Sequence, residues 1–172
     1  QVTKKMMLVG NPIKQSKENS LGTQRHESPK IYVTGGSQGS EFINKNIPIA
    51  LNALNIPLEV RQQSGNGKSI GVKELYSSNI SVEVEEFYDL PHDVILWSDF
   101  IISRAGALSL SEAISLKRGS VIIPLPSAID NHQLLNAKNI VNLDMGLIHE
   151  ESQAIESLTQ KLQKVIETKV YE

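Results

Sequence analysis

Short runs rich in Ile and Val alternate with longer amphipathic stretches from residue 30 onward. The short runs predict strands at 31–34, 57–62, 80–85, 99–103, 120–123 and 147–149, each apolar enough to be buried on both faces. The longer stretches predict helices at 39–54, 68–77, 91–97, 107–118, 130–143 and 152–168. Strands that alternate with helices in this way indicate an α/β domain with a parallel sheet and helices on both faces.

The residues before this pattern have a different character. Met6–Lys14 predicts a short strand followed by a turn, and the polar, aperiodic residues 15–29 predict a linker. We therefore divide the chain into a strand with a polar linker at 1–29 and one domain at 30–172.

Composition narrows the class of protein. A chain of 172 residues with 40% hydrophobic residues suits one domain with a sizeable core. The net charge of −2 gives no indication of a nucleic-acid partner, and the absence of cysteine excludes disulfides and thiolate chemistry. No apolar run approaches the ~18 residues needed to cross a bilayer, and no signal peptide is visible. We expect a soluble, cytoplasmic protein.

Two glycine-containing turns carry the strongest functional signal. Each follows a predicted strand and precedes a predicted helix, one at Gly35-Gly-Ser-Gln-Gly39 and one at Ser103-Arg-Ala-Gly106. Glycine lets a ligand approach the backbone, and the first N–H groups of a helix attract anions. The pair therefore predicts a diphosphate-bearing ligand between two helix N-termini, with Ser37 as a side-chain donor. The alternative for the first turn is a tight connection that needs glycine for its geometry alone.

The second turn leaves two questions open. Ser109 and Glu112 have the S-x-x-E spacing of a capping box, in which Glu112 would only cap the helix. The alternative is that the Glu112 carboxylate accepts hydrogen bonds from a ribose cis-diol. Arg104 stands where it would face either a phosphate or an acidic neighbour. Gly119 is expected to end the helix 107–118.

A third polar segment, Asp130-Asn-His-Gln133, follows a predicted strand and opens a helix, with Asp130 as its expected N-cap. Its side chains are suited to sugar hydroxyls, and a polar surface turn is the alternative. The four histidines are far apart and lack the spacing of metal ligands, so we expect no metal site and no cofactor.

Taken in order, these motifs resemble the MurG family of UDP-GlcNAc:lipid I N-acetylglucosaminyltransferases. The resemblance rests on Val9-Gly-Asn-Pro-Ile, Gly35-Gly-Ser-Gln-Gly39, Gln63-Ser-Gly-Asn-Gly67, Glu86-Phe-Tyr, Trp97-Ser-Asp99, Ser103-Arg-Ala-Gly-Ala-Leu-Ser-Leu-Ser-Glu112 and Asp130-Asn-His-Gln-Leu-Leu-Asn-Ala137. It implies a Rossmann-like domain that is one half of a GT-B glycosyltransferase, the half that binds the donor UDP-GlcNAc, and it makes residues 1–29 an interdomain segment.

The resemblance also implies residue roles. Ser37 contacts the diphosphate, the Tyr88 backbone amide reads uracil, Ala107, Leu108 and Ser109 bring backbone groups to the phosphates and sugar, and Glu112 holds the ribose. Gln133, with Asn131 and His132, reads the GlcNAc hydroxyls, and Asn136 supports them. The full set of candidate substrate-binding residues is Lys14, Gly36, Ser37, Gln38, Tyr88, Arg104, Gly106, Ala107, Leu108, Ser109, Glu112, Asn131, His132 and Gln133.

Two departures from the family bear on activity. Lys14 stands where the family commonly has arginine. Lysine keeps the positive charge but lacks the planar guanidinium, which can form two parallel hydrogen bonds. The family's acceptor-binding N-terminal domain has no counterpart here, and that domain is where catalytic groups, lipid I binding and contact with the cytoplasmic membrane face are expected. The intact protein is then an inverting hexosyltransferase, and this fragment alone is expected to be inactive. The alternatives are a non-catalytic sugar-nucleotide-binding subunit with a separate partner and an unrelated nucleotide-binding regulator.

Overall fold

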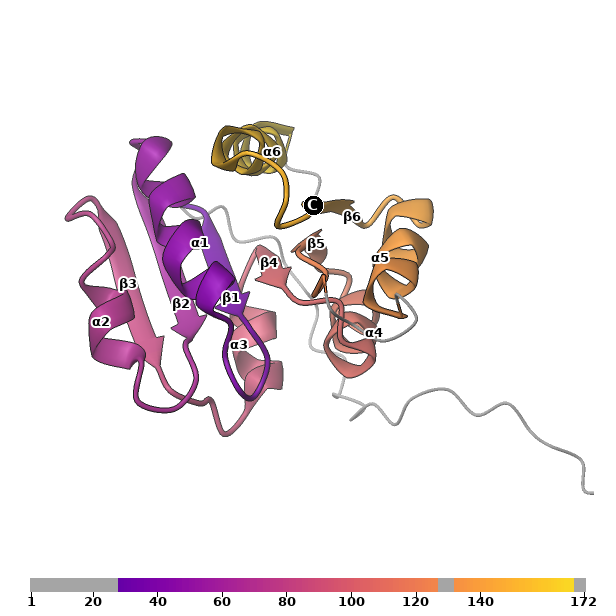
Figure 1. Cartoon of the computed structure of the whole chain (residues 1–172), viewed down its shortest axis with the longest axis horizontal. Coiled ribbons are helices and arrows are strands. Elements are labelled where there is room, and N and C mark those ends of the chain that lie inside the picture. Colours follow the sequence, from indigo (N-terminus) through magenta and orange to yellow (C-terminus); the bar gives the residue numbers. More distant parts are fainter. Residues whose placement is uncertain (1–27, 127–131, 169–172) are drawn as a thin grey trace, which may run out of the picture.

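The computed structural model describes residues 28–126 and 132–168, and within them six parallel strands form one sheet (Figure 1). The strands lie in the order β3-β2-β1-β4-β5-β6, and every neighbouring pair is parallel. Their bounds are β1 Lys30–Thr34, β2 Leu58–Gln63, β3 Ile80–Glu85, β4 Phe100–Ser103, β5 Gly119–Ile122 and β6 Gly146–Ile148. This is the strand order of the Rossmann fold, so the predicted α/β class and parallel sheet are confirmed.

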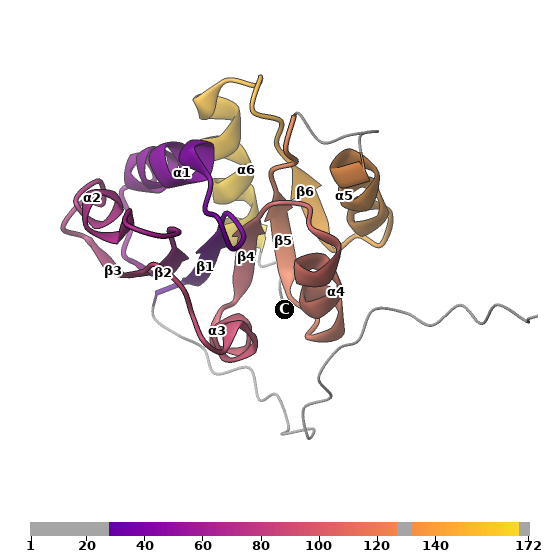
Figure 2. The ribbon, with the colours of Figure 1, turned by 60° about the horizontal axis from the view of Figure 1, so that its bottom comes forward.

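Helices cover both faces of the sheet, as Figure 2 shows in a view that separates them. The helices are α1 Glu41–Ala53, α2 Ser69–Lys73, α3 Pro91–Trp97, α4 Ala107–Ser115, α5 His132–Asn142 and α6 Ile155–Thr168. Apolar side chains of α1 and α6 pack on one face, whereas α3, α4 and α5 pack on the other. The two faces therefore have separate cores.

The alternation of side chains along each central strand builds these two cores. In β1, Ile31 and Val33 join the core under α1 and α6, while Tyr32 joins the core under α3 and α4. In β4, Phe100 and Ile102 share the first core and Ile101 the second. All six side chains are at most 3% exposed, so β1 and β4 are buried on both faces, as their apolar sequences predict. The same prediction is wrong for the edge strand β3, where buried positions alternate with more exposed ones.

Several predicted bounds are wrong by a few residues. The helix expected at 68–77 is the shorter α2, Ser69–Lys73, in which only Val72 is buried. The helix expected at 107–118 ends at Ser115, and the residue that turns the chain is Lys117, with a φ of 52°. Gly119, expected to end that helix, instead begins β5. The segment 1–27 and the expected N-cap Asp130 lie outside the described residues.

Strands β1 and β4 lie side by side at the centre of the sheet, although β2 and β3 separate them in sequence. The chain leaves β1 toward one edge of the sheet and leaves β4 toward the other, which opens a crevice at the carboxyl ends of these two strands. Both glycine turns lie there. No helix within residues 28–126 and 132–168 is long and apolar enough to cross a membrane.

One buried histidine makes the stability of the fold sensitive to acid. His149 follows β6 and is 0% exposed, and neither ring nitrogen has a hydrogen-bond partner among the described residues. Burial, with a smaller effect of the Lys161 charge, lowers the pKa of His149 from 6.5 to about 4. Between these two pH values His149 is protonated in the unfolded chain and neutral in the folded chain. The free energy of unfolding therefore falls as the pH drops below about 6.5 toward 4.

We expect acidification from about pH 7 to about pH 5.5 to cost about 1 kcal/mol of unfolding free energy through His149. Urea denaturation at the two pH values measures this loss. A His149→Leu variant should lose most of this pH dependence, whereas a His92→Leu control on the surface helix α3 should keep it. An unchanged acid slope in His149→Leu would show that another group is responsible.

Candidate functional site

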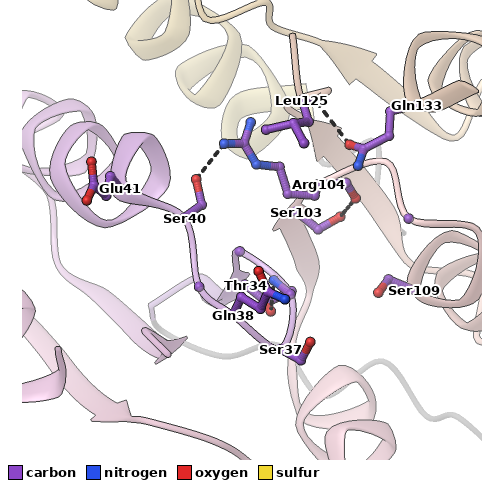
Figure 3. A pocket seen from close by; sticks show the side chains of 14 residues that line it. Thr34, Ser37, Gln38, Ser40, Glu41, Ser103, Arg104, Ser109, Leu125 and Gln133 are labelled. Carbon is purple, nitrogen blue, oxygen red and sulfur yellow. Dashed lines mark hydrogen bonds between the residues drawn. The ribbon is translucent and has the colours of Figure 1, made fainter. Parts of the chain in front are cut away.

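Two adjoining cavities open at the carboxyl ends of β1 and β4. The larger, of about 450 Å³, is shown in Figure 3. It is lined by Thr34, Gly35, Gly36, Ser37, Gln38, Gly39, Ser40, Glu41, Ser103, Arg104, Gly106, Ser109, Leu125 and Gln133. The smaller, of about 280 Å³, is lined by Tyr32, Thr34, Gly36, Ser37, Gln63, Phe87, Tyr88, Pro91, Ile95, Ile101, Ser109 and Glu112. Thr34, Gly36, Ser37 and Ser109 line both, so one elongated ligand can occupy the two cavities together.

The turn after β1 presents its backbone to both cavities. Gly36 and Gly39 have φ values of 84° and 70°, and the Gly39 N–H donates to the Gly36 carbonyl at 3.1 Å. This closes a turn with Ser37 and Gln38, both exposed, at its tip. Successive N–H groups in such a turn form a concave anion site. The structure therefore contains the predicted glycine turn, and its binding of an anion stays a prediction.

The two helix N-termini that were expected to flank the ligand are not equivalent. Helix α1 begins at Glu41, and its N-cap Ser40 accepts a hydrogen bond from the Ile43 N–H. Helix α4 begins at Ala107, and its N-cap Gly106 supplies no side-chain bond. The two termini therefore differ in that a side chain of the N-cap residue caps α1 and none caps α4.

The predicted capping box at Ser109 is wrong. Ser109 lies inside the first turn of α4, and the N-cap is Gly106, three residues earlier. Glu112 therefore does not cap this helix. Its side chain is half-buried and lines the smaller cavity, and its charge is one cause of the raised pKa of Tyr32. The capping alternative for Glu112 is therefore wrong, and its ribose-binding role stays a prediction.

Arg104 faces an acidic neighbour in this structure. Its guanidinium forms an ion pair with Glu151 at 2.5 Å and donates to Ser40 Oγ at 2.6 Å. It also donates to the carbonyls of Ile123 and Pro124 at 3.2 and 3.3 Å. Arg104 thus ties the turn after β1 to the segments that follow β5 and β6. Arg104 was expected to face either a phosphate or an acidic neighbour, and in the structure it faces the acidic Glu151.

The smaller cavity is lined by aromatic and apolar side chains together with polar ones. The rings of Tyr32 and Tyr88 meet edge to face, with centroids 6.0 Å apart. Burial raises the pKa of Tyr32 to about 12, while a hydrogen bond with Thr34 lowers it and Glu112 raises it. Burial, followed by Glu83, also raises the pKa of Tyr88. Both phenols therefore stay neutral, and they add no charge to the wall of the smaller cavity.

Gln63 lines the smaller cavity, although the sequence analysis names it only within a family motif and gives it no role. It ends β2, is 7% exposed, and bridges two segments of the smaller cavity. Its Nε2 donates to the Gly36 carbonyl at 3.1 Å, and its Oε1 accepts from the Tyr88 N–H at 3.2 Å. The backbone N–H of Tyr88, which the resemblance assigns to uracil, thus already donates to Gln63. A base that uses this N–H must displace Gln63 Oε1. The sequence signal that could have assigned Gln63 to the site is an amide side chain at the carboxyl end of a predicted strand.

The third polar segment enters the larger cavity through Gln133. Its Oε1 accepts from the backbone N–H groups of Ala105 and Leu125 at 3.3 and 2.9 Å. Its Nε2 has no partner among the described residues and remains a donor for a ligand. Asn136 donates to the Ala105 carbonyl at 3.1 Å, so in the structure it supports the second turn, whereas the resemblance had it support the Gln133 segment.

Most candidate residues that the structure describes converge on the two cavities. The cavities are lined by Gly36, Ser37, Gln38, Tyr88, Arg104, Gly106, Ser109, Glu112 and Gln133. Ala107 and Leu108 occupy the first turn of α4 without lining either cavity, and Leu108 is 60% exposed. Lys14, Asn131 and the side chain of His132 lie outside what the structure describes. The described residues contain no group of three His, Asp or Glu arranged to hold a metal ion.

Comparison with known proteins gives this arrangement a context. The model of the glycosyltransferase family 28 C-terminal domain matches residues 30–171. Two curated relatives carry the name UDP-N-acetylglucosamine--N-acetylmuramyl-(pentapeptide) pyrophosphoryl-undecaprenol N-acetylglucosamine transferase. The relative from Aeromonas hydrophila is 33% identical over 81% of this chain, and that from Rickettsia felis 34% identical over 91%. The chain spans 40% and 43% of their lengths, less than half of either.

Solved structures agree with these matches. A crystal structure of MurG from Acinetobacter baumannii superposes with a TM-score of 0.79 at 30% identity, over 86% of this chain and 46% of that one. The glycosyltransferase SnogD from Streptomyces nogalater superposes with a TM-score of 0.63 at 18% identity, over 95% of this chain and 42% of that one, which is a likeness of fold alone.

Proposed function

Because the chain belongs to the glycosyltransferase family 28 C-terminal domains, we propose that it is the donor-binding half of a transferase that uses UDP-GlcNAc. The observation that carries the proposal is the pair of joined cavities. One has aromatic and apolar walls with a carboxylate, and the other has a glycine turn and the N-cap of α4, Gly106, which has no capping side chain. A nucleoside linked to a diphosphate sugar has the same division into a flat apolar part and a charged part.

Each part of the donor then has a place. The uracil lies against Tyr88, and the ribose hydroxyls reach Glu112 in the same cavity. The diphosphate extends from the shared wall into the larger cavity, between the Ser37 turn and the first turn of α4. The sugar extends into the larger cavity, toward the Gln133 amide. The donor roles of Lys14, Asn131 and His132 remain part of this proposal.

This placement assigns the chain a role in leaving-group departure. In the inverting transfer that we propose, an acceptor hydroxyl gives its proton to a base outside this chain and attacks the anomeric carbon, while UDP leaves with the bonding electron pair. Negative charge grows on the β-phosphate as that bond breaks. The N–H groups of the Ser37 turn and of the α4 N-terminus are fixed before the reaction and stabilise this charge. These groups supply a stabilisation that does not require a divalent metal.

We further propose that acceptor binding belongs to residues outside this chain, because the chain spans less than half of its relatives. The relatives' names describe an acceptor that carries undecaprenol, a lipid. By analogy, the intact protein transfers GlcNAc to a lipid-linked acceptor, lipid I, in peptidoglycan synthesis. It acts as a peripheral protein on the cytoplasmic side of the membrane.

Calorimetric titration tests the donor assignment. The chain is expected to bind UDP-GlcNAc at least about tenfold more tightly than ADP-glucose, which corresponds to about 1.4 kcal/mol. UDP-GalNAc, which differs at one sugar hydroxyl, is expected to bind with intermediate affinity. Binding with excess EDTA should match binding with Mg²⁺. Equal affinity for the uridine and adenosine donors, or a tenfold loss with EDTA, would contradict the proposal.

A further inference from the structure

We propose that the Ser40 hydroxyl is a further ligand of the donor diphosphate and that Arg104 positions it. This inference rests on the proposed donor site. Ser40 follows the Gly36–Gly39 turn, is 6% exposed, and lines the larger cavity. Figure 3 shows its side chain and that of Arg104 pointing toward one another at the edge of that cavity.

The hydrogen bonds of Ser40 leave its proton available. Ser40 Oγ accepts from the Ile43 N–H at 3.2 Å and from Arg104 Nη2 at 2.6 Å. A serine hydroxyl has two lone pairs and one proton, so these two bonds fill its acceptor capacity. The remaining O–H has no acceptor among the described residues. A buried hydroxyl whose proton lacks a partner favours an acceptor-rich ligand, and phosphate oxygens are such acceptors.

Arg104 is held too firmly to act as a free phosphate ligand. Its Nη1 contacts Glu151 and the carbonyls of Ile123 and Pro124, and its side chain is 12% exposed. Among the described residues that line the two cavities, Arg104 is the only Lys or Arg, and Glu151 balances its charge. Its remaining bond goes to Ser40, so Arg104 fixes the hydroxyl and increases its acidity through a charge-assisted bond. It is therefore a positioning residue.

The test separates this role from helix capping by comparing two ligands. Glycine is nearly as good an N-cap as serine, so Ser40→Gly removes the hydroxyl at little cost to α1. We expect Ser40→Gly to weaken UDP about fivefold or more, the loss of one hydrogen bond to a charged group, and to leave uridine affinity within twofold. Ser40→Thr, which keeps a hydroxyl, should restore UDP affinity. Equal losses for UDP and uridine, or no loss for either, would overturn the proposal.

A double-mutant cycle on UDP affinity tests the positioning role of Arg104. If Arg104 acts through Ser40, Arg104→Lys should cost less in the Ser40→Gly background than in the wild type. Additive losses would show that Arg104 contacts the phosphate independently. If Arg104→Lys does not fold, the Ser40 comparison of UDP with uridine still decides the hydroxyl's role. Failure of the wild-type chain to bind UDP would instead refute the donor site itself.

Discussion

Replacement of Gly39 by alanine is expected to lower the free energy of unfolding by about 3 kcal/mol or more and to remove donor binding. Gly39 has a φ of 70°, which strains any other residue, and a Cβ placed there would lie 2.1 Å from the Ser64 carbonyl oxygen. That oxygen cannot easily retreat, since it accepts from the buried Asn44 Nδ2 at 2.8 Å. The turn that carries Ser37 must therefore move.

Gly36→Ala is the matched control for this substitution. Gly36 has a φ of 84°, but no atom lies within 4 Å of an added Cβ. Its alanine variant should lose only the cost of the backbone strain, about 1 kcal/mol. Urea denaturation of the two variants measures the difference. Equal losses would show that Gly39 is needed for its dihedral angle and not for its close contact with the Ser64 loop.

Replacement of Glu112 by alanine is expected to weaken UDP-GlcNAc about 30-fold or more, because two charge-assisted hydrogen bonds to the ribose are lost. Glu112→Gln keeps the shape and should cost on the order of 1–2 kcal/mol of binding free energy. Glu112 is not part of a capping box, and alanine favours helices, so thermal unfolding should be nearly unchanged. Calorimetry and a melting curve on each variant give both quantities.

The outcome that would count against this account is a large drop in melting temperature with unchanged affinity per folded molecule. It would assign Glu112 a structural role in α4. Leu110 and Ala113, the buried residues of that helix, are the ones whose truncation or enlargement should have such an effect.

Local sequence predicts the elements of this fold where the burial pattern and the end signals agree. The bounds of β3 and α3 are as predicted, since strand alternation is clear in Ile80–Glu85 and Pro91 fixes the first turn of α3. The end of α4 was mispredicted because Lys117, which has no sequence signal for a left-handed conformation, makes the turn expected of Gly119. The sheet pairs Gly119 with Phe100, which local pattern does not reveal.

The site was predictable as far as it depends on strand–turn–helix units. The turn at Ser37 and the helix start at Ala107 followed from glycines next to apolar runs. The polar bridges between these units were not predictable. Arg104 bonds Ser40 across 64 positions, and Gln63 bonds the Tyr88 amide across 25. Such contacts depend on which strands become neighbours in the sheet and on how deeply each side chain is buried. The spacing of residues along the sequence specifies neither.

The most direct test of the donor site combines Glu112→Gln with 2′-deoxy-UDP in a thermodynamic cycle, because it links the identity of the ligand to its place in the structure. If the Glu112 carboxylate holds the ribose, loss of the 2′-hydroxyl should cost the wild type on the order of 1 kcal/mol or more and cost Glu112→Gln much less. Equal costs in both proteins would show that Glu112 does not touch the ribose, and would contradict the placement of a uridine diphosphate sugar across these two cavities.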